Sequence, residues 1–156
     1  MKRFRKSWAG RCQHGVAAVE MALMLPALLG MLGGMLLMGR VFYHYEVALR
    51  AAHDAAVYLS QVPQIEMRTA GQADNEVALA KAIVTQEIAG LNPGPDMPAI
   101  TVQCDGVSCT GFAPGTIRIV VQLNMIDELF DAYTFPLMGD DGIRLVADVT
   151  LRYVGK

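Results

Sequence analysis

Few residues of this 156-residue chain have the types and spacing that catalysis requires. His44 and His53 stand nine residues apart in a predicted helix, which separates them by about 13 Å, too far to share a metal ion. Residues 140–142, Asp-Asp-Gly, lack the alternating oxygen ligands of a calcium loop. The sequence contains no nucleophile motif, phosphate-binding loop or metalloprotease motif. It therefore predicts no enzyme, no metal site, no cofactor and no small-molecule substrate.

The acidic side chain with the most informative surroundings is Glu20. It is the only charged residue in the 23 residues from Val16 to Met38, and no polar face interrupts this stretch. A helix of this length spans about 35 Å, which is enough to cross a hydrocarbon core of about 30 Å. Because an acid within a span costs roughly 2.5–3.5 kcal/mol on insertion scales, it needs a reason to be there. A partner is one reason; the alternative is that Glu20 snorkels to the nearby interface.

The charges divide around this apolar stretch. Residues 1–15 carry five basic side chains and no acid, whereas residues 16–156 carry eight basic and fifteen acidic ones, a net charge of −7. The positive-inside rule predicts that the short basic end is cytoplasmic and that the chain after Arg40 is exported. The acidic remainder argues against nucleic-acid binding, which requires a basic face.

The cysteines divide in the same way. Cys12 lies in the basic leader, whereas Cys104 and Cys109 lie in the exported part with four residues between them. In an oxidising compartment these two are expected to form a disulfide; the alternative is a pair of reduced thiols.

A basic segment followed by an apolar one is typical of a secretory signal, but three details disagree. The apolar stretch is too long, it contains Glu20, and no A-x-A-like site closes it. The residue suited to a peptidase, Gly15, instead precedes the stretch. Without a Cβ atom, its backbone can approach catalytic groups closely.

The segment QHGVAAVEMALMLP, residues 13–26, resembles the processing site of type IV pilin-like proteins. Within that class the chain is most similar to the TadE-like minor pseudopilins of tight-adherence (Flp-type) pilus systems. The similarity includes Pro26 shortly after the glutamate, an arginine and aromatic residues in GRVFYHY (39–45), and the Ala-rich segment 48–60. The C-terminal pattern of strands around a Pro-containing loop is similar too.

This resemblance implies a structural subunit that helps to assemble, prime or cap a pilus. A prepilin peptidase would cut between Gly15 and Val16, although many pilins begin with Met or an aromatic residue rather than valine. Glu20 would then pair with the new Val16 ammonium, in its own chain or a neighbouring subunit, and set the register of assembly. The implied partners are other pilin and pseudopilin subunits and the assembly platform. The implied location is the bacterial inner membrane, with a periplasmic C-terminal domain and entry into an extracellular pilus.

Two other functions stay open. One is a minor pseudopilin of a type II secretion system, against which Pro26 and the C-terminal pattern argue. The other is a single-span scaffold or binding protein whose leader is never removed.

The elements that position these residues begin with the span, residues 16–38. Pro26 removes a helical hydrogen bond and predicts a kink, and Gly30 and Gly34 form a G-x-x-x-G pattern that lets another helix approach. The helix is expected to continue as a spine over residues 39–62, ended by Val62-Pro63. Its predicted apolar stripe is Val41, Tyr45, Ala48, Ala52, Ala55 and Leu59.

The remainder, residues 63–156, is predicted to be an exported α+β domain. We expect a loop at 64–72, a second amphipathic helix at 75–89, and a small antiparallel sheet against that helix and the spine. The strands are indicated by alternating apolar residues at 100–104, 117–125 and 145–153. Asp105-Gly106 predicts a hairpin turn beside the cysteines. The connection 126–142 is the candidate partner surface.

Overall fold

The computed structural model describes residues 14–91, 98–125 and 142–155. They form three α-helices, a 3-10 turn and three strands. In chain order these are α1 (His14–Gln61), α2 (Gln64–Arg68), α3 (Ala70–Ile88), η1 (Ala89–Leu91), β1 (Ala99–Cys104), β2 (Thr116–Met125) and β3 (Ile143–Arg152). The contacts divide the chain into one unit that ends at Leu36 and another that begins at Leu37. The predicted α+β class, with a long N-terminal helix and a small sheet, is confirmed.

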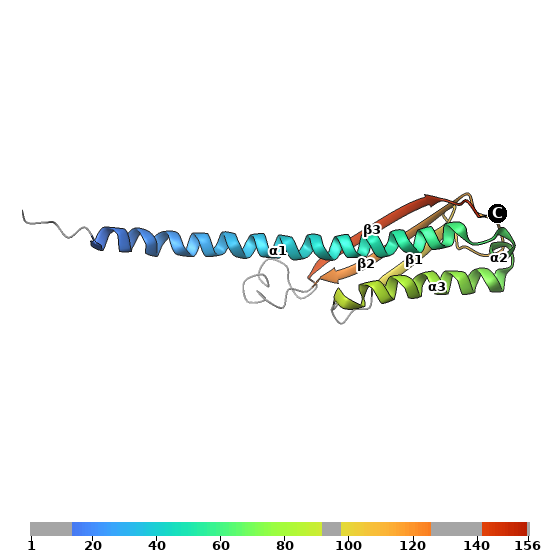
Figure 1. The fold of residues 1–156 in the computed structure, drawn as a ribbon, viewed down its shortest axis with the longest axis horizontal. Helices are drawn as coiled ribbons and strands as arrows, with labels where there is room; N and C mark the ends of the chain where they lie inside the picture. The colour runs from blue at the N-terminus through green and yellow to red at the C-terminus, as the bar shows by residue number, and fades with distance from the viewer. Residues whose placement is uncertain (1–13, 92–97, 126–141, 156) are drawn as a thin grey trace, which may run out of the picture. The chain divides into compact units, whose positions relative to one another are not determined.

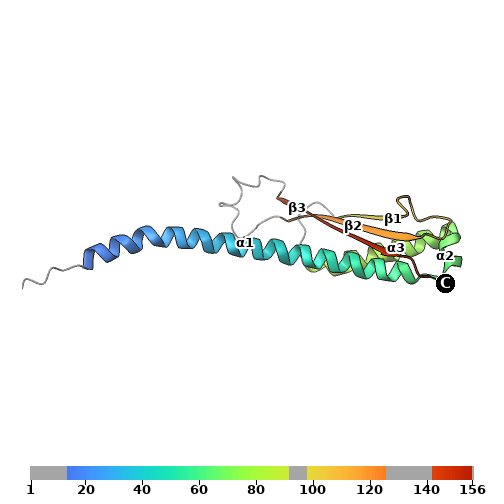
Figure 2. The same cartoon turned by 90° about the horizontal axis from the view of Figure 1, so that it is seen from above.

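The second unit has two layers. Its sheet has the order β1-β2-β3 and is antiparallel throughout. The last part of α1 and the whole of α3 lie side by side against one face of this sheet (Figures 1 and 2). The expected packing of the sheet on the second helix and on the spine is therefore confirmed.

The core of this unit is built from small residues of α1 and larger ones of the sheet. Ala48, Ala52, Ala55 and Leu59 are buried as the apolar stripe predicts, whereas Tyr45 is 38% exposed. Small side chains let neighbouring elements approach the helix closely. The sheet fills the other side with alternating inward residues of β2 and β3, which are Ile117, Ile119, Val121, Leu123, Leu145 and Ala147.

The opposite face of the sheet is polar. Arg118 of β2 donates to both carboxylate oxygens of Asp148 on β3, from its Nε at 3.0 and 3.1 Å. This pair lies diagonally across the ladder, since Asp148 stands directly opposite Val120. The cation lowers the pKa of the Asp148 carboxyl through its hydrogen bond.

The predicted end of the spine is confirmed, whereas the predicted loop after it is not. The spine ends at Gln61, just before Val62-Pro63, as predicted. The expected loop at 64–72 is wrong, because Gln64–Arg68 form α2 and α3 already begins at Ala70. The cause is Met67, which is fully buried and holds this short helix on the core, whereas Ile65 of the same helix is 71% exposed.

Candidate functional site

The first unit consists of helix α1 up to Leu36, and its surface is apolar. Large apolar side chains along it are more than half exposed, from Val16 at 63% and Leu23 at 74% to Leu36 at 52%. A core helix of a soluble domain would bury such residues. Within the described residues, α1 is the one helix long and apolar enough to cross a membrane.

The predicted processing and assembly residues all fall on this helix. Gly15 lies in its first turn, since α1 begins at His14. Val16 and Glu20 follow, both exposed, and their spacing of four places them one above the other on the same face of the helix. Residues 1–13, which include Cys12 and the basic side chains of the leader, lie outside the described residues, and the proposed cut and the Val16–Glu20 pairing stay predictions.

The residues predicted to shape the span are also on α1. Pro26 lies inside the helix, and a kink there stays a prediction. Gly30 is half-buried, while Gly34 is exposed with open space where a Cβ atom would stand. The helix therefore has room beside Gly34 for another backbone, and close packing at the G-x-x-x-G pattern stays a prediction.

Comparison with protein families matches residues 15–57 to the family described as TadE-like protein. This segment of the chain is TadE-like. The match begins at Gly15 and covers the exposed apolar helix together with the Ala-rich part of the spine. It confirms the family resemblance that residues 13–26 indicated. Comparison with curated proteins and with solved structures gave no significant match.

The match connects the chain with a pilus system of the tight-adherence type. The TadE-like family is associated with pili and is structural. The single apolar helix fits a single-pass membrane protein. The TadE-like segment ends at residue 57, so the sheet, α3 and the disulfide lie beyond it.

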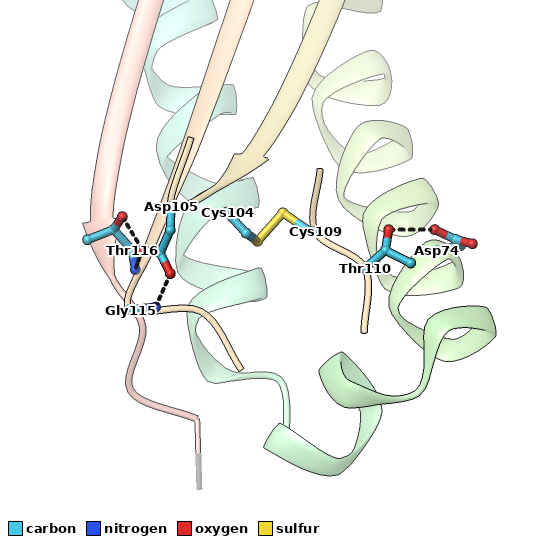
Figure 3. Close-up of a disulfide and its surroundings, with 7 residues drawn as sticks. All are labelled: Asp74, Cys104, Asp105, Cys109, Thr110, Gly115 and Thr116. Carbon is cyan, nitrogen blue, oxygen red and sulfur yellow. Dashed lines mark hydrogen bonds between the residues drawn. A yellow bond between two sulfur atoms is a disulfide. The ribbon is translucent and has the colours of Figure 1, made fainter. Parts of the chain in front are cut away.

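The predicted disulfide between Cys104 and Cys109 is present, with the two Cα atoms 4.8 Å apart. It encloses the predicted turn, in which Asp105 and Gly106 have φ values of 51° and 85°. Two positive φ values are typical of a type I′ hairpin turn, which asparagine, aspartate and glycine tolerate best. Figure 3 shows the bridge at the tip of the sheet, where Thr110 also donates to Asp74 of α3 at 3.4 Å.

The carboxylate of Asp105 has a role that the sequence did not reveal. It accepts hydrogen bonds from the backbone N–H of Gly115 at 2.7 Å and from the N–H of Thr116 at 2.8 Å. The Thr116 hydroxyl adds a third, at 2.9 Å (Figure 3). These donors, with the Gly115 N–H foremost, lower the pKa of Asp105. The turn is thereby tied to the start of β2.

A second unpredicted site is His44, which is 8% exposed. Its Nδ1 lies 2.8 Å from the carbonyl oxygen of Arg40, and its Nε2 lies 3.2 Å from the carbonyl oxygen of Leu91. The imidazole therefore links α1 to η1 at the start of the second unit. The separation of 47 residues between His44 and Leu91 hides this contact from any local sequence pattern.

Two further polar contacts tie down the far end of α1. The Tyr58 hydroxyl donates to the Glu76 carboxylate of α3, and this hydrogen bond is the largest cause that raises the pKa of Tyr58 to about 12. Beyond the helix, the N–H of Val154 donates to the carbonyl oxygen of Ser60 at 3.0 Å. Gly155 follows, where a Cβ atom would overlap the Val62 carbonyl oxygen, so only glycine fits there.

The remaining candidates for chemistry are on the surface. His53 lies 3.4 Å from its neighbour Asp54, and both side chains are exposed. Within the described residues, no group of three or more His, Cys, Asp or Glu side chains is placed to hold a metal ion. The connection predicted as a partner surface, 126–142, lies outside the described residues except for Gly142.

Proposed function

We propose that this chain is a minor pilin-like structural subunit that helps to assemble, prime or cap a tight-adherence pilus. The observation that carries the proposal is the TadE-like match over the exposed apolar helix, beginning at Gly15. The same match favours a tight-adherence system over a type II secretion system, the alternative within the same class of proteins.

In this proposal the helix over residues 16–38 holds the subunit in the bacterial inner membrane. The basic leader stays in the cytoplasm and the second unit is periplasmic, as the charge asymmetry of the sequence favours. The disulfide between Cys104 and Cys109 supports an oxidising location for the domain. Proposed partners are the prepilin peptidase, the assembly platform and other pilin or pseudopilin subunits, and the subunit can then enter the extracellular pilus.

The chemistry of the site is an ion pair created by proteolysis. Cleavage between Gly15 and Val16 produces a free ammonium on Val16, one helical turn from Glu20. In the apolar interior of a helix bundle this ammonium and the Glu20 carboxylate neutralise each other, within one chain or between neighbours. A subunit at the wrong axial position would leave a buried charge without a partner, which costs about 3–5 kcal/mol. The pair thus selects one register.

The test compares three variants in the host: Gly15→Ala, Glu20→Ala and Glu20→Gln. The Gly15→Ala chain is expected to remain at precursor mass, because the larger residue obstructs the peptidase. Both Glu20 variants are expected to be cut, with a new N-terminus at Val16, and to reduce the number of pili. Glu46→Ala is the matched control, since Glu46 is an exposed acid farther along the same helix, 3.6 Å from Arg50.

Mass spectrometry of the membrane fraction and counting of pili by electron microscopy give the readouts. A wild-type protein that keeps residues 1–15 while pili form normally without it would overturn the proposal. It would leave the single-span scaffold as the better description. Normal pilus numbers in both Glu20 variants would overturn the register function alone.

A further inference from the structure

Immediately after the proposed span, α1 has two different sides. Leu37, His44 and Ala48 are buried at 9%, 8% and 1% exposure, because η1 and the sheet cover that side. The other side stays open, with Met38 at 52%, Phe42 at 65% and Tyr43 at 63% exposure. Large aromatic side chains this exposed in a folded domain indicate a surface that something else covers.

We propose that this open side, defined as Met38, Phe42 and Tyr43 and here named the aromatic collar, lies in the headgroup layer of the membrane. The inference rests on the proposed span of residues 16–38. It adds a site that the proposed function lacks: a lipid-binding surface at the start of the spine.

The depth of these residues supports a lipid occupant. Counted from Met38 at 1.5 Å per residue, Phe42 and Tyr43 lie about 6 and 7.5 Å beyond the end of the span. The headgroup layer on each side of a bilayer is roughly 5–7.5 Å thick, and amphipathic aromatic rings are enriched there. The collar also continues, along one helix, the exposed apolar side chains that end at Leu36.

The width of the open side favours lipid over a second helix. The exposed positions are 38, 39, 42, 43, 45 and 46, and with 3.6 residues per turn they cover about 160° of the helix circumference. A seam between two helices is narrower, since it uses only the positions that face the partner. A lipid layer surrounds every side that the domain leaves open.

The consequence is that the side of the helix opposite the collar is already covered by protein. Leu37, the first buried residue, is next to the end of the span, and His44 joins the helix to Leu91 at the same level as the collar. Extraction of the subunit into a filament then has to remove Phe42 and Tyr43 from lipid as well as the span itself.

Depth-dependent fluorescence quenching tests this proposal on the full chain. Trp8, the one tryptophan in the sequence, is replaced by Phe, and a single new tryptophan is introduced as Phe42→Trp or Tyr43→Trp. Each protein is placed in vesicles of phosphatidylethanolamine and phosphatidylglycerol that contain lipid spin-labelled on the headgroup or deep in the acyl chain. Leu28→Trp reports on the middle of the span, and His53→Trp, on an exposed side chain farther along α1, is the control outside the membrane.

In both collar variants we expect the headgroup label to quench the fluorescence more than the acyl-chain label does. In Leu28→Trp we expect the acyl-chain label to quench more. Neither label should affect the fluorescence of His53→Trp. Collar variants with water-like emission and no quenching would overturn the lipid surface, as would blue-shifted emission that neither lipid quenches, which indicates protein cover. Quenching of only one of the two collar variants would point to a helix seam and also overturn it. If Leu28→Trp itself is not quenched, the proposed span fails together with the collar.

Discussion

The hydroxyl of Tyr153 donates a hydrogen bond of 2.6 Å to the backbone carbonyl oxygen of Val62, 91 residues earlier in the chain. Both residues are buried. The side-chain amide of Gln64 donates in turn to the carbonyl oxygen of Gly155 at 3.3 Å. The end of β3 is therefore fastened to the turn that follows α1, where the backbone leaves the helix and its carbonyl groups need new donors.

Replacing Tyr153 by Phe removes this donor and leaves the Val62 carbonyl buried without it. We expect the free energy of unfolding to fall by about 1–2 kcal/mol, measured by chemical denaturation of the detergent-solubilised chain. Tyr45→Phe is the control, because Tyr45 is 38% exposed, and it should change stability by less than about 0.5 kcal/mol. Equal effects of the two substitutions would contradict the assigned bond.

The disulfide makes a second prediction. Cys104 and Cys109 close a loop with a sequence separation of 5, and loop-closure entropy for so short a loop stabilises by about 2 kcal/mol. The double variant Cys104→Ala/Cys109→Ala should unfold at a lower denaturant concentration than the oxidised wild type. Adding a reductant should lower the midpoint of the wild type and leave the double variant unchanged. If the reductant also lowered the midpoint of the double variant, its effect could not be assigned to the disulfide between Cys104 and Cys109.

Asp105 predicts a pH dependence. Its pKa in the folded chain lies below the unfolded value of about 3.9, so its contribution is present above that value and is lost as the pH falls through the folded pKa. Asp105→Asn keeps a residue that tolerates the positive φ of 51° but removes the charge. The variant should be less stable than the wild type at neutral pH, and the difference should shrink as the pH falls below about 3.9.

Unfolding midpoints measured across this pH range check the prediction. Asp148 also has a lowered pKa, so its protonation in acid destabilises both proteins. The comparison therefore uses the difference in stability between wild type and variant. A difference that stays constant with pH would show that Asp105 acts through its shape and not its charge.

Tyr58 offers a direct spectroscopic test. Its pKa is raised to about 12, chiefly by the hydrogen bond to Glu76, so its stabilising contribution is present below the unfolded value of about 10 and is lost as the pH rises through about 12. In Glu76→Gln, one of the five tyrosines should shift its ionisation toward about 10. Ultraviolet absorbance of tyrosinate measures this shift. Glu87→Gln, on the same helix, should leave the curve unchanged; a shift there instead would contradict the pairing.

Much of the fold could be predicted because local patterns determine it. Alternation of apolar and polar residues marked all three strands, Pro63 marked the end of the spine, and Asp105-Gly106 marked the turn. The segment 64–72 was assigned wrongly because its helix depends on one buried side chain, Met67, and not on a repeating pattern.

The polar contacts of the second unit could not be predicted from the sequence. The Tyr153–Val62 contact joins residues far apart in the chain, and so does the contact of His44 with Leu91. The reach of the Asp105 carboxylate to Thr116 depends on how the turn folds back over the start of β2. In each case the partner is a backbone group, which every residue carries and no sequence pattern distinguishes.

The fastening of residues 153–155 to residues 60–64 has a consequence for timing. A ribosome makes the chain from its N-terminus, so the acceptor carbonyls of Ser60 and Val62 exist long before their donors Val154 and Tyr153. This junction therefore forms only after residues 153 and 154 have been made. Chains interrupted before residue 153 would display these carbonyl groups without their donors.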